Sequence, residues 1–169
     1  INAGNATATN MSQMTDAITN QEHYLKTHYD QPMVQAIMTE LNSNESRLWF
    51  VNSDSIYQAS WEKYENGMVV ATKIYKYNGE KIIKVCCMEE AGRTPWTSAR
   101  SSCTSIYFDS SMSKAEIYNT RNWFSGFSKL KTVNYTGNLN TSKVTDMAGM
   151  FKNCSSLTNL SISSWNVSN

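Results

Sequence analysis

The feature that most constrains this chain is an internal repeat in its C-terminal half. The stretch from Trp123 to Tyr135 aligns with the stretch from Met150 to Ile162, 27 residues later. After one additional residue in the first copy, residues 139–143 align with residues 165–169 at an offset of 26. Repeats of this length bury their apolar faces only against their neighbours. The sequence therefore predicts a C-terminal region, residues 96–169, built from similar stacked units and truncated at its end.

The apolar residues of each unit predict one short strand and one short helix. Alternation along the strand places Leu160 and Ile162 on the inner side, with Ser161 facing solvent. Apolar residues spaced three, three and one between Val144 and Phe151 indicate one face of a helix opened by Thr145 or Asp146. A strand and a helical turn alternating at this period are typical of leucine-rich repeats.

Residues 139–160 resemble the repeat of BspA-like leucine-rich repeat surface proteins. The segment 106–112, followed by Trp123 and Phe124, resembles the lead-in to the first regular repeat of that family. The resemblance covers residues 96–169 and departs from the pattern at residues 134–137, which carry one additional residue. It implies the capped start of a solenoid of about two coils.

The same resemblance implies a function and a location. Members of the family are mostly secreted or anchored at bacterial surfaces, and some are implicated in adhesion. This implies a non-enzymatic attachment or recognition module that is extracellular or at the bacterial cell surface. Other members are carried on phage particles, so the alternative is a structural or receptor-binding component of a virion or tail appendage.

The first 47 residues are expected to form a polar arm and a helical region. Residues 1–10 are polar, and Pro32 separates two short apolar patterns because the residue before a proline is pushed out of the helical conformation. Two helices are predicted from apolar residues at helical intervals, Met11, Met14, Ile18 and Leu25 in the first and Met33, Ile37, Met38 and Leu41 in the second.

Residues 48–95 are expected to form a small antiparallel β region. Asn78-Gly79 separates two β-rich runs, residues 68–77 and 80–87, and predicts a hairpin that pairs them, with Ile74 opposite Ile83. Residues 48–51 and 56–64 are further strand candidates, the second ending at a turn over 65–67. The overall expectation is an α+β fold, in which N-terminal helices and a small antiparallel β-sheet precede the start of a leucine-rich-repeat solenoid.

Composition argues against several classes of partner. Fifteen Lys and Arg oppose 14 Asp and Glu, a net charge of +1, so nucleic acid is not an expected partner. Mean hydropathy is −0.48 and no apolar run approaches the length of a membrane span.

Catalytic and metal-binding patterns are not recognisable in the sequence. We find no phosphate-binding glycine loop, nucleophile elbow or zinc-protease helix. His23 and His28 would lie about 140° apart on a helix, which separates them as metal ligands. No enzyme activity, cofactor or metal is therefore expected, although a hydrolase acting on a surface polymer is a third alternative that needs an acid–base pair.

A polar patch on the repeat region is the candidate binding site. Extended sheet faces of repeat proteins bind other molecules, and a solvated face is the simpler alternative. We expect a protein or glycan on a surface as the ligand, and the patch consists of Lys131, Thr132 and Asn134 beside Thr158, Asn159 and Ser161. Further repeats of the same chain or a neighbouring subunit are expected to cover the C-terminal end.

Overall fold

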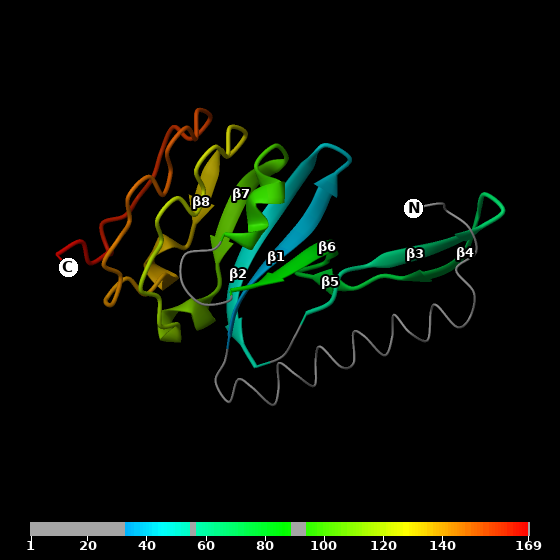
Figure 1. Ribbon diagram of the computed structural model, residues 1–169, viewed down its shortest axis with the longest axis horizontal. Helices are drawn as coiled ribbons and strands as arrows, with labels where there is room; N and C mark the ends of the chain where they lie inside the picture. The colour runs from blue at the N-terminus through cyan, green and yellow to red at the C-terminus, as the bar shows by residue number, and fades with distance from the viewer. Residues whose placement is uncertain (1–32, 55–56, 89–93, 169) are drawn as a thin grey trace. The chain divides into compact units, whose positions relative to one another are not determined.

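β-Strands dominate the part of the chain that the structure describes. The structure is a computed structural model that describes residues 33–54, 57–88 and 94–168, all within one packing unit, residues 33–169. Six strands form one mixed sheet in the order β5-β6-β1-β2-β7-β8, and β3 and β4 form a separate two-stranded sheet (Figure 1). The strands are β1 (Met33–Asn42), β2 (Glu45–Ser53), β3 (Trp61–Glu65), β4 (Met68–Lys73), β5 (Lys76–Tyr77), β6 (Glu80–Cys87), β7 (Cys103–Phe108) and β8 (Thr132–Asn134).

The expected α+β class is wrong, because the described residues are mostly β. They contain no α-helix, and their helical segments are three short 3-10 helices. These are η1 (Pro95–Ala99), η2 (Ser110–Lys114) and η3 (Thr136–Asn138). The first predicted helix, the polar arm and both histidines fall in residues 1–32, outside the described residues.

The second predicted helix is instead the strand β1. Met33, Ile37, Met38 and Leu41 do recur at helical intervals, but β1 lies between β2 and β6 and is buried on both faces, with Ala36 1% and Ile37 0% exposed. A strand covered on both faces carries apolar residues without strict alternation. Its pattern therefore imitates that of a short buried helix.

The sheet is antiparallel at its centre and parallel toward one edge. β1 pairs antiparallel with both β2 and β6. β2 pairs with β7, and β7 with β8, in parallel. The repeat region therefore adds β7 and β8 to the sheet that β1 and β2 begin.

Two tight turns direct the strands between β3 and β6. Asn78 and Gly79 have φ of 50° and 83°, and Tyr77 pairs with Glu80, so a two-residue turn forms where the sequence predicts it. The predicted pairing of the whole run 68–77 with residues 80–87 is wrong. β4 pairs with β3 across Asn66-Gly67, and β6 pairs mainly with β1. Pairing with β1 buries Ile82 to 1% exposure.

We expect Gly79→Val to lower the free energy of unfolding by about 1–2 kcal/mol, because a β-branched residue would be held at positive φ. An added Cβ meets no atom within 4 Å at this position, so the cost is conformational. The measurement is urea unfolding followed by circular dichroism. Gly137→Ala is the matched control, since its added Cβ makes ordinary contact with Ser164 at 3.5 Å. Equal stability of the two variants would contradict the turn.

The helix predicted over residues 144–151 does not form. The segment consists of turns, and Gly149 within it has a φ of 66°. The Asp146 carboxylate accepts a hydrogen bond from the backbone N–H of Ala148 at 2.8 Å. A residue in the left-handed conformation favours a turn over a helix. A side chain that accepts a hydrogen bond from the backbone N–H two residues later has the same effect.

The predicted inner strand of the last repeat is also absent. Residues 157–162 are not assigned to a strand, and Ile162 is 40% exposed. The repeat spacing nevertheless appears as contacts: the backbone N–H groups of Thr120, Asn122 and Phe124 donate to carbonyls 26 residues later. With neither the helix nor this strand, the described residues form no leucine-rich-repeat solenoid.

Two clusters of buried side chains cover opposite faces of the sheet. The larger cluster contains Phe50, Phe108 and Phe124, all 0% exposed, together with Trp96 of η1 and Met112 of η2. The smaller contains Ile37, Val51 and Ile82, against which Trp49, Tyr57 and Tyr77 pack. The second cluster lies over the middle of the sheet, so the same face is less covered toward β8.

Candidate binding face

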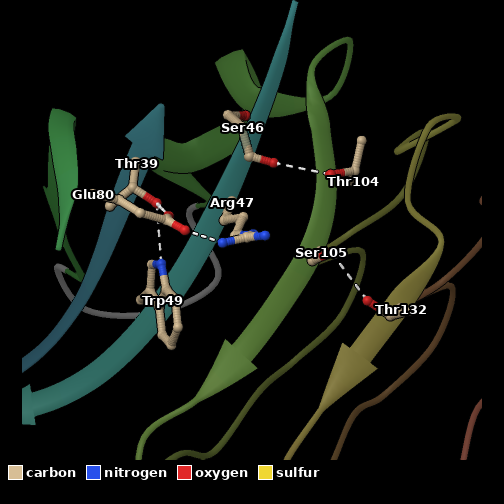
Figure 2. Close-up of polar contacts among 8 residues, drawn as sticks. All are labelled: Thr39, Ser46, Arg47, Trp49, Glu80, Thr104, Ser105 and Thr132. Carbon is tan, nitrogen blue, oxygen red and sulfur yellow. Dashed lines mark hydrogen bonds and ion pairs between the residues drawn. The ribbon is translucent and has the colours of Figure 1, made fainter. Parts of the chain in front are cut away.

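Four residues from four strands form a continuous polar row across this second face. The register places Thr39 of β1 opposite Arg47 of β2, Arg47 opposite Ser105 of β7, and Ser105 opposite Thr132 of β8. Directly opposed residues on neighbouring strands project from the same face of a sheet. We call these four residues the polar row (Figure 2).

An aromatic row runs beside the polar row. Its members follow those of the polar row by two positions on each strand. Trp49 is opposite Tyr107, and Tyr107 is opposite Asn134. The rings of Trp49 and Tyr107 stack with centroids 4.0 Å apart and an interplanar angle of 14°. Tyr135 continues the row at 6.1 Å from Tyr107, and Tyr77 contacts the Trp49 ring edge-to-face at 5.5 Å.

A β-bulge sets the register of the polar row. Ser46 pairs with Cys103, but Arg47 pairs with Ser105, so Thr104 is an additional residue on β7. Thr104 is 4% exposed and its hydroxyl donates to the Ser46 carbonyl at 3.5 Å. Bulges reorient side chains locally. Here the bulge brings Ser105, rather than Thr104, opposite Arg47.

Glu80 anchors the Arg47 side chain over the sheet. The Glu80 carboxylate forms an ion pair with the Arg47 guanidinium and accepts a hydrogen bond from the Thr39 hydroxyl at 2.6 Å. The Trp49 indole N–H in turn donates to the Thr39 oxygen at 3.1 Å. Figure 2 shows these groups meeting above β1 and β2. The Arg47 Nε atom is buried without a hydrogen-bond partner among the described residues.

We expect Glu80→Gln to lower the free energy of unfolding by about 1–3 kcal/mol, because it leaves the partly buried Arg47 charge without its counterion. The side chains of Arg47 and Glu80 are only 28% and 18% exposed. Glu65→Gln is the control: Glu65 pairs with Lys63 but is 52% exposed, so its removal should change stability by less than about 0.5 kcal/mol. Thermal and urea unfolding measure both. A larger loss in Glu65→Gln would show that Glu80 is not the anchor.

The structure places Thr132 and Asn134 of the sequence-predicted patch on this face. Thr132 donates to the Ser105 hydroxyl at 3.0 Å, and the Asn134 amide donates to the Ile106 carbonyl at 3.1 Å. The Lys131 ammonium lies 3.7 Å from the Glu45 carboxylate and its side chain is 64% exposed. Thr132 and Asn134 thus lie at the β8 end of the two rows, and Lys131 directly precedes β8.

The other three residues of the predicted patch are exposed but do not lie on a strand. Thr158, Asn159 and Ser161 are solvent-exposed and belong to a segment without an assigned strand. They follow the β8 residues by 26 or 27 positions along the chain. The predicted continuous sheet surface of six residues is therefore ordered as strand only at Thr132 and Asn134.

Sequence reasoning missed the residues that β1, β2 and β7 contribute. Arg47 and Trp49 alternate with the buried Leu48 and Phe50, and Ser105 and Tyr107 alternate with Ile106 and Phe108. This alternation is a readable signal for residues that share one face. The pairing of β2 with β7, more than fifty residues apart, has no local signal in the sequence.

The thiols of the buried cysteines pack rather than project onto this face. Burial raises the pKa of Cys103 to about 12, and it also raises the pKa values of Cys86 and Cys154. The Cys154 thiol donates to the Phe124 carbonyl at 3.1 Å. None of the four cysteines, all of which lie within the described residues, forms a disulfide.

Neither a metal cluster nor a membrane-spanning helix is found in the described part of the chain. No three His, Cys, Asp or Glu side chains among those residues gather closely enough to hold a metal ion. Within the same ranges, no helix has the length and apolar character needed to cross a membrane.

Comparison with known proteins gives one match, and it covers the C-terminal part of the chain. No curated protein and no solved structure shows significant similarity. The matched segment begins before β7 and includes β8, and it excludes the strands β1, β2 and β6 that complete the sheet. Residues 101–169 match the family described as "Mycoplasma protein of unknown function, DUF285".

Proposed function

We propose that this chain is a non-enzymatic recognition module that attaches to a protein or glycan on a surface. The binding surface is the part of the second sheet face at β7 and β8, which we call the open face. The observation that carries the proposal is the pair of rows across β2, β7 and β8. Their side chains are fixed in place before any ligand binds, by ring stacking at Trp49–Tyr107 and by hydrogen bonds at Ser105–Thr132. Ordered side chains lose little entropy on binding.

The exposure of side chains along the sheet also supports binding at this face. Thr39, which bonds Glu80 and Trp49, is 0% exposed, whereas Thr132 and Lys131 toward the β8 edge of the sheet are exposed. Tyr135 is 66% exposed, next to the half-buried Tyr107. A partly exposed aromatic ring surrounded by hydrogen-bonding groups is typical of a recognition surface. The module would act outside the cell or at the cell surface.

Binding of the fluorescently labelled 169-residue chain to whole cells tests this proposal. The probes are cultured epithelial cells and intact bacterial cells, read by flow cytometry over a concentration series. We expect saturable binding to at least one of them. Thr132→Glu, which inserts an unpaired charge in the open face, should weaken it.

Ser113→Glu is the matched control for that experiment. Ser113 is exposed on η2, and its hydroxyl bonds only the Ser110 carbonyl of the same helix. It should bind like the unaltered chain. No saturable binding to either cell type, or equal loss in both variants, would overturn the proposed function.

A further inference from the structure

The charges around the open face are paired within the chain. Arg47 pairs with Glu80, and Lys131 lies within ion-pair distance of Glu45. An ionic ligand gains little from a surface whose charges already neutralise each other, because its own charge meets no uncompensated opposite charge. The electrostatics of this face therefore complement an uncharged ligand.

The polar groups of this face are two hydroxyls and one amide, of which Thr132 is exposed and Ser105 and Asn134 are half-buried. Ser105, Thr132 and Asn134 are linked to each other by hydrogen bonds of 3.0 Å and 3.2 Å. The Thr132 hydroxyl hydrogen and both Asn134 amide hydrogens are used within the chain. The Ser105 hydroxyl can still donate to a ligand hydroxyl, and the Asn134 side-chain oxygen can still accept from one. They stand on neighbouring strands, which are spaced about 4.8 Å apart, similar to the length of one pyranose unit.

Tyr135 adds an aromatic surface at the edge of these groups. It has φ of 56° and ψ of 40°, a left-handed conformation that is unfavourable for a tyrosine. Strain of this kind gathers at functional sites. The Tyr135 ring is tilted 50° from that of Tyr107, and the Tyr107 ring also stacks on Trp49. An exposed ring held beside hydroxyl groups suits a ligand with an apolar C–H face and polar edges, which is the chemistry of a pyranose.

We propose that the open face binds a neutral oligosaccharide, with Tyr135 stacking on a pyranose ring and Ser105, Thr132 and Asn134 hydrogen-bonding its hydroxyls. The inference rests on the proposed function and names its ligand class. A protein partner is less suited, since the core of a protein interface needs several large residues that become desolvated together. Of the three aromatic residues Trp49, Tyr107 and Tyr135 on this face, Tyr135 is the one that is mostly exposed.

Isothermal titration of the 169-residue chain with defined sugars tests the ligand class. The probes are cellohexaose, chitohexaose, mannohexaose and maltohexaose, with a heparin oligosaccharide as the anionic contrast. We expect saturable binding of at least one neutral sugar, with an affinity that does not change when sodium chloride is raised. Binding of the anionic sugar alone, weakened by salt, would overturn the proposal.

Variants of Tyr135 separate stacking from other effects. Tyr135→Ala should weaken sugar binding about tenfold, the scale of one aromatic contact, and Tyr135→Phe should retain it. Tyr118→Ala is the matched control, because Tyr118 is 57% exposed and contacts Lys143 and Glu116 instead. Equal binding by Tyr135→Ala and the unaltered chain would contradict the assignment of this ring.

Treated cells distinguish failure of this inference from failure of the proposed function. Periodate cleaves vicinal diols of glycans, whereas protease removes surface polypeptides. Loss of cell binding after periodate supports the oligosaccharide. Binding that survives periodate and is lost after protease overturns it while the recognition function stands. Absence of binding to untreated cells and to every sugar overturns both.

Discussion

Phe124→Ala is expected to lower the free energy of unfolding by about 3–5 kcal/mol, the usual range for truncating a fully buried aromatic residue. Phe124 is 0% exposed. Its ring contacts Phe50 of β2 at 5.6 Å and Phe151 of the following repeat segment at 5.4 Å. It therefore joins the shared sheet to the segments of the repeat region, and its loss opens a cavity between them.

The backbone of Phe124 makes its own contribution, which the alanine variant retains. Its N–H donates to the Met150 carbonyl at 2.9 Å. The expected loss thus reports side-chain packing, measured by urea unfolding. Tyr118→Ala, which removes an exposed ring, should stay within about 0.5 kcal/mol of the unaltered chain. A comparably small change in Phe124→Ala would show that the aromatic cluster is not packed as described.

Stability is expected to fall at alkaline pH, with Cys103 as a principal cause. Burial raises the pKa of this thiol from 9.0 to about 12. Well below pH 9 the thiol is neutral in both the folded and the unfolded state, so it does not affect the pH dependence of stability there. Between pH 9 and about 12 the unfolded chain ionises it while the folded chain does not, so stability falls by up to about 1.4 kcal/mol per pH unit, about 4 kcal/mol in all.

Urea unfolding at several values between pH 8 and 11 measures this loss. Cys103→Ala removes the buried thiol at little change in volume, so its stability should decline less steeply with pH. A residual slope is expected, because burial also raises the pKa values of Cys86, Cys154 and Tyr77, with Asp109 adding to the shift at Tyr77. Identical pH profiles for Cys103→Ala and the unaltered chain would contradict the role of this residue.

Local chemistry was readable from the sequence. Asn78-Gly79 forms its turn because two adjacent residues suffice to favour positive φ. The spacing of 26–27 residues reappears as hydrogen bonds from Thr120 and Phe124 to carbonyls 26 positions later, and as stacking of Phe124 on Phe151, 27 positions later. Thr132 and Asn134, which the sequence marks as polar and alternating, lie two apart on β8 and so share one face of the sheet.

Secondary structure was misread where long-range contacts override local pattern. The apolar spacing of residues 33–41 suits a helix, but burial between two strands makes it β1. The spacing of residues 144–151 suits a helix as well, yet Gly149 at positive φ and the Asp146 side chain favour turns. In both segments the side-chain period alone could not tell which neighbours the backbone would bond.

The sequence by itself determined the turns, the repeat spacing and part of the polar patch, since each depends on residues that are neighbours in the chain or recur at a fixed interval. Only the tertiary structure decided that β2 pairs in parallel with β7, and hence that Thr39, Arg47, Ser105 and Thr132 share one row. Strand partners are selected by the burial of both sheet faces together, a property of the assembled sheet. The candidate binding face exists because that assembly places one aromatic and one polar row side by side.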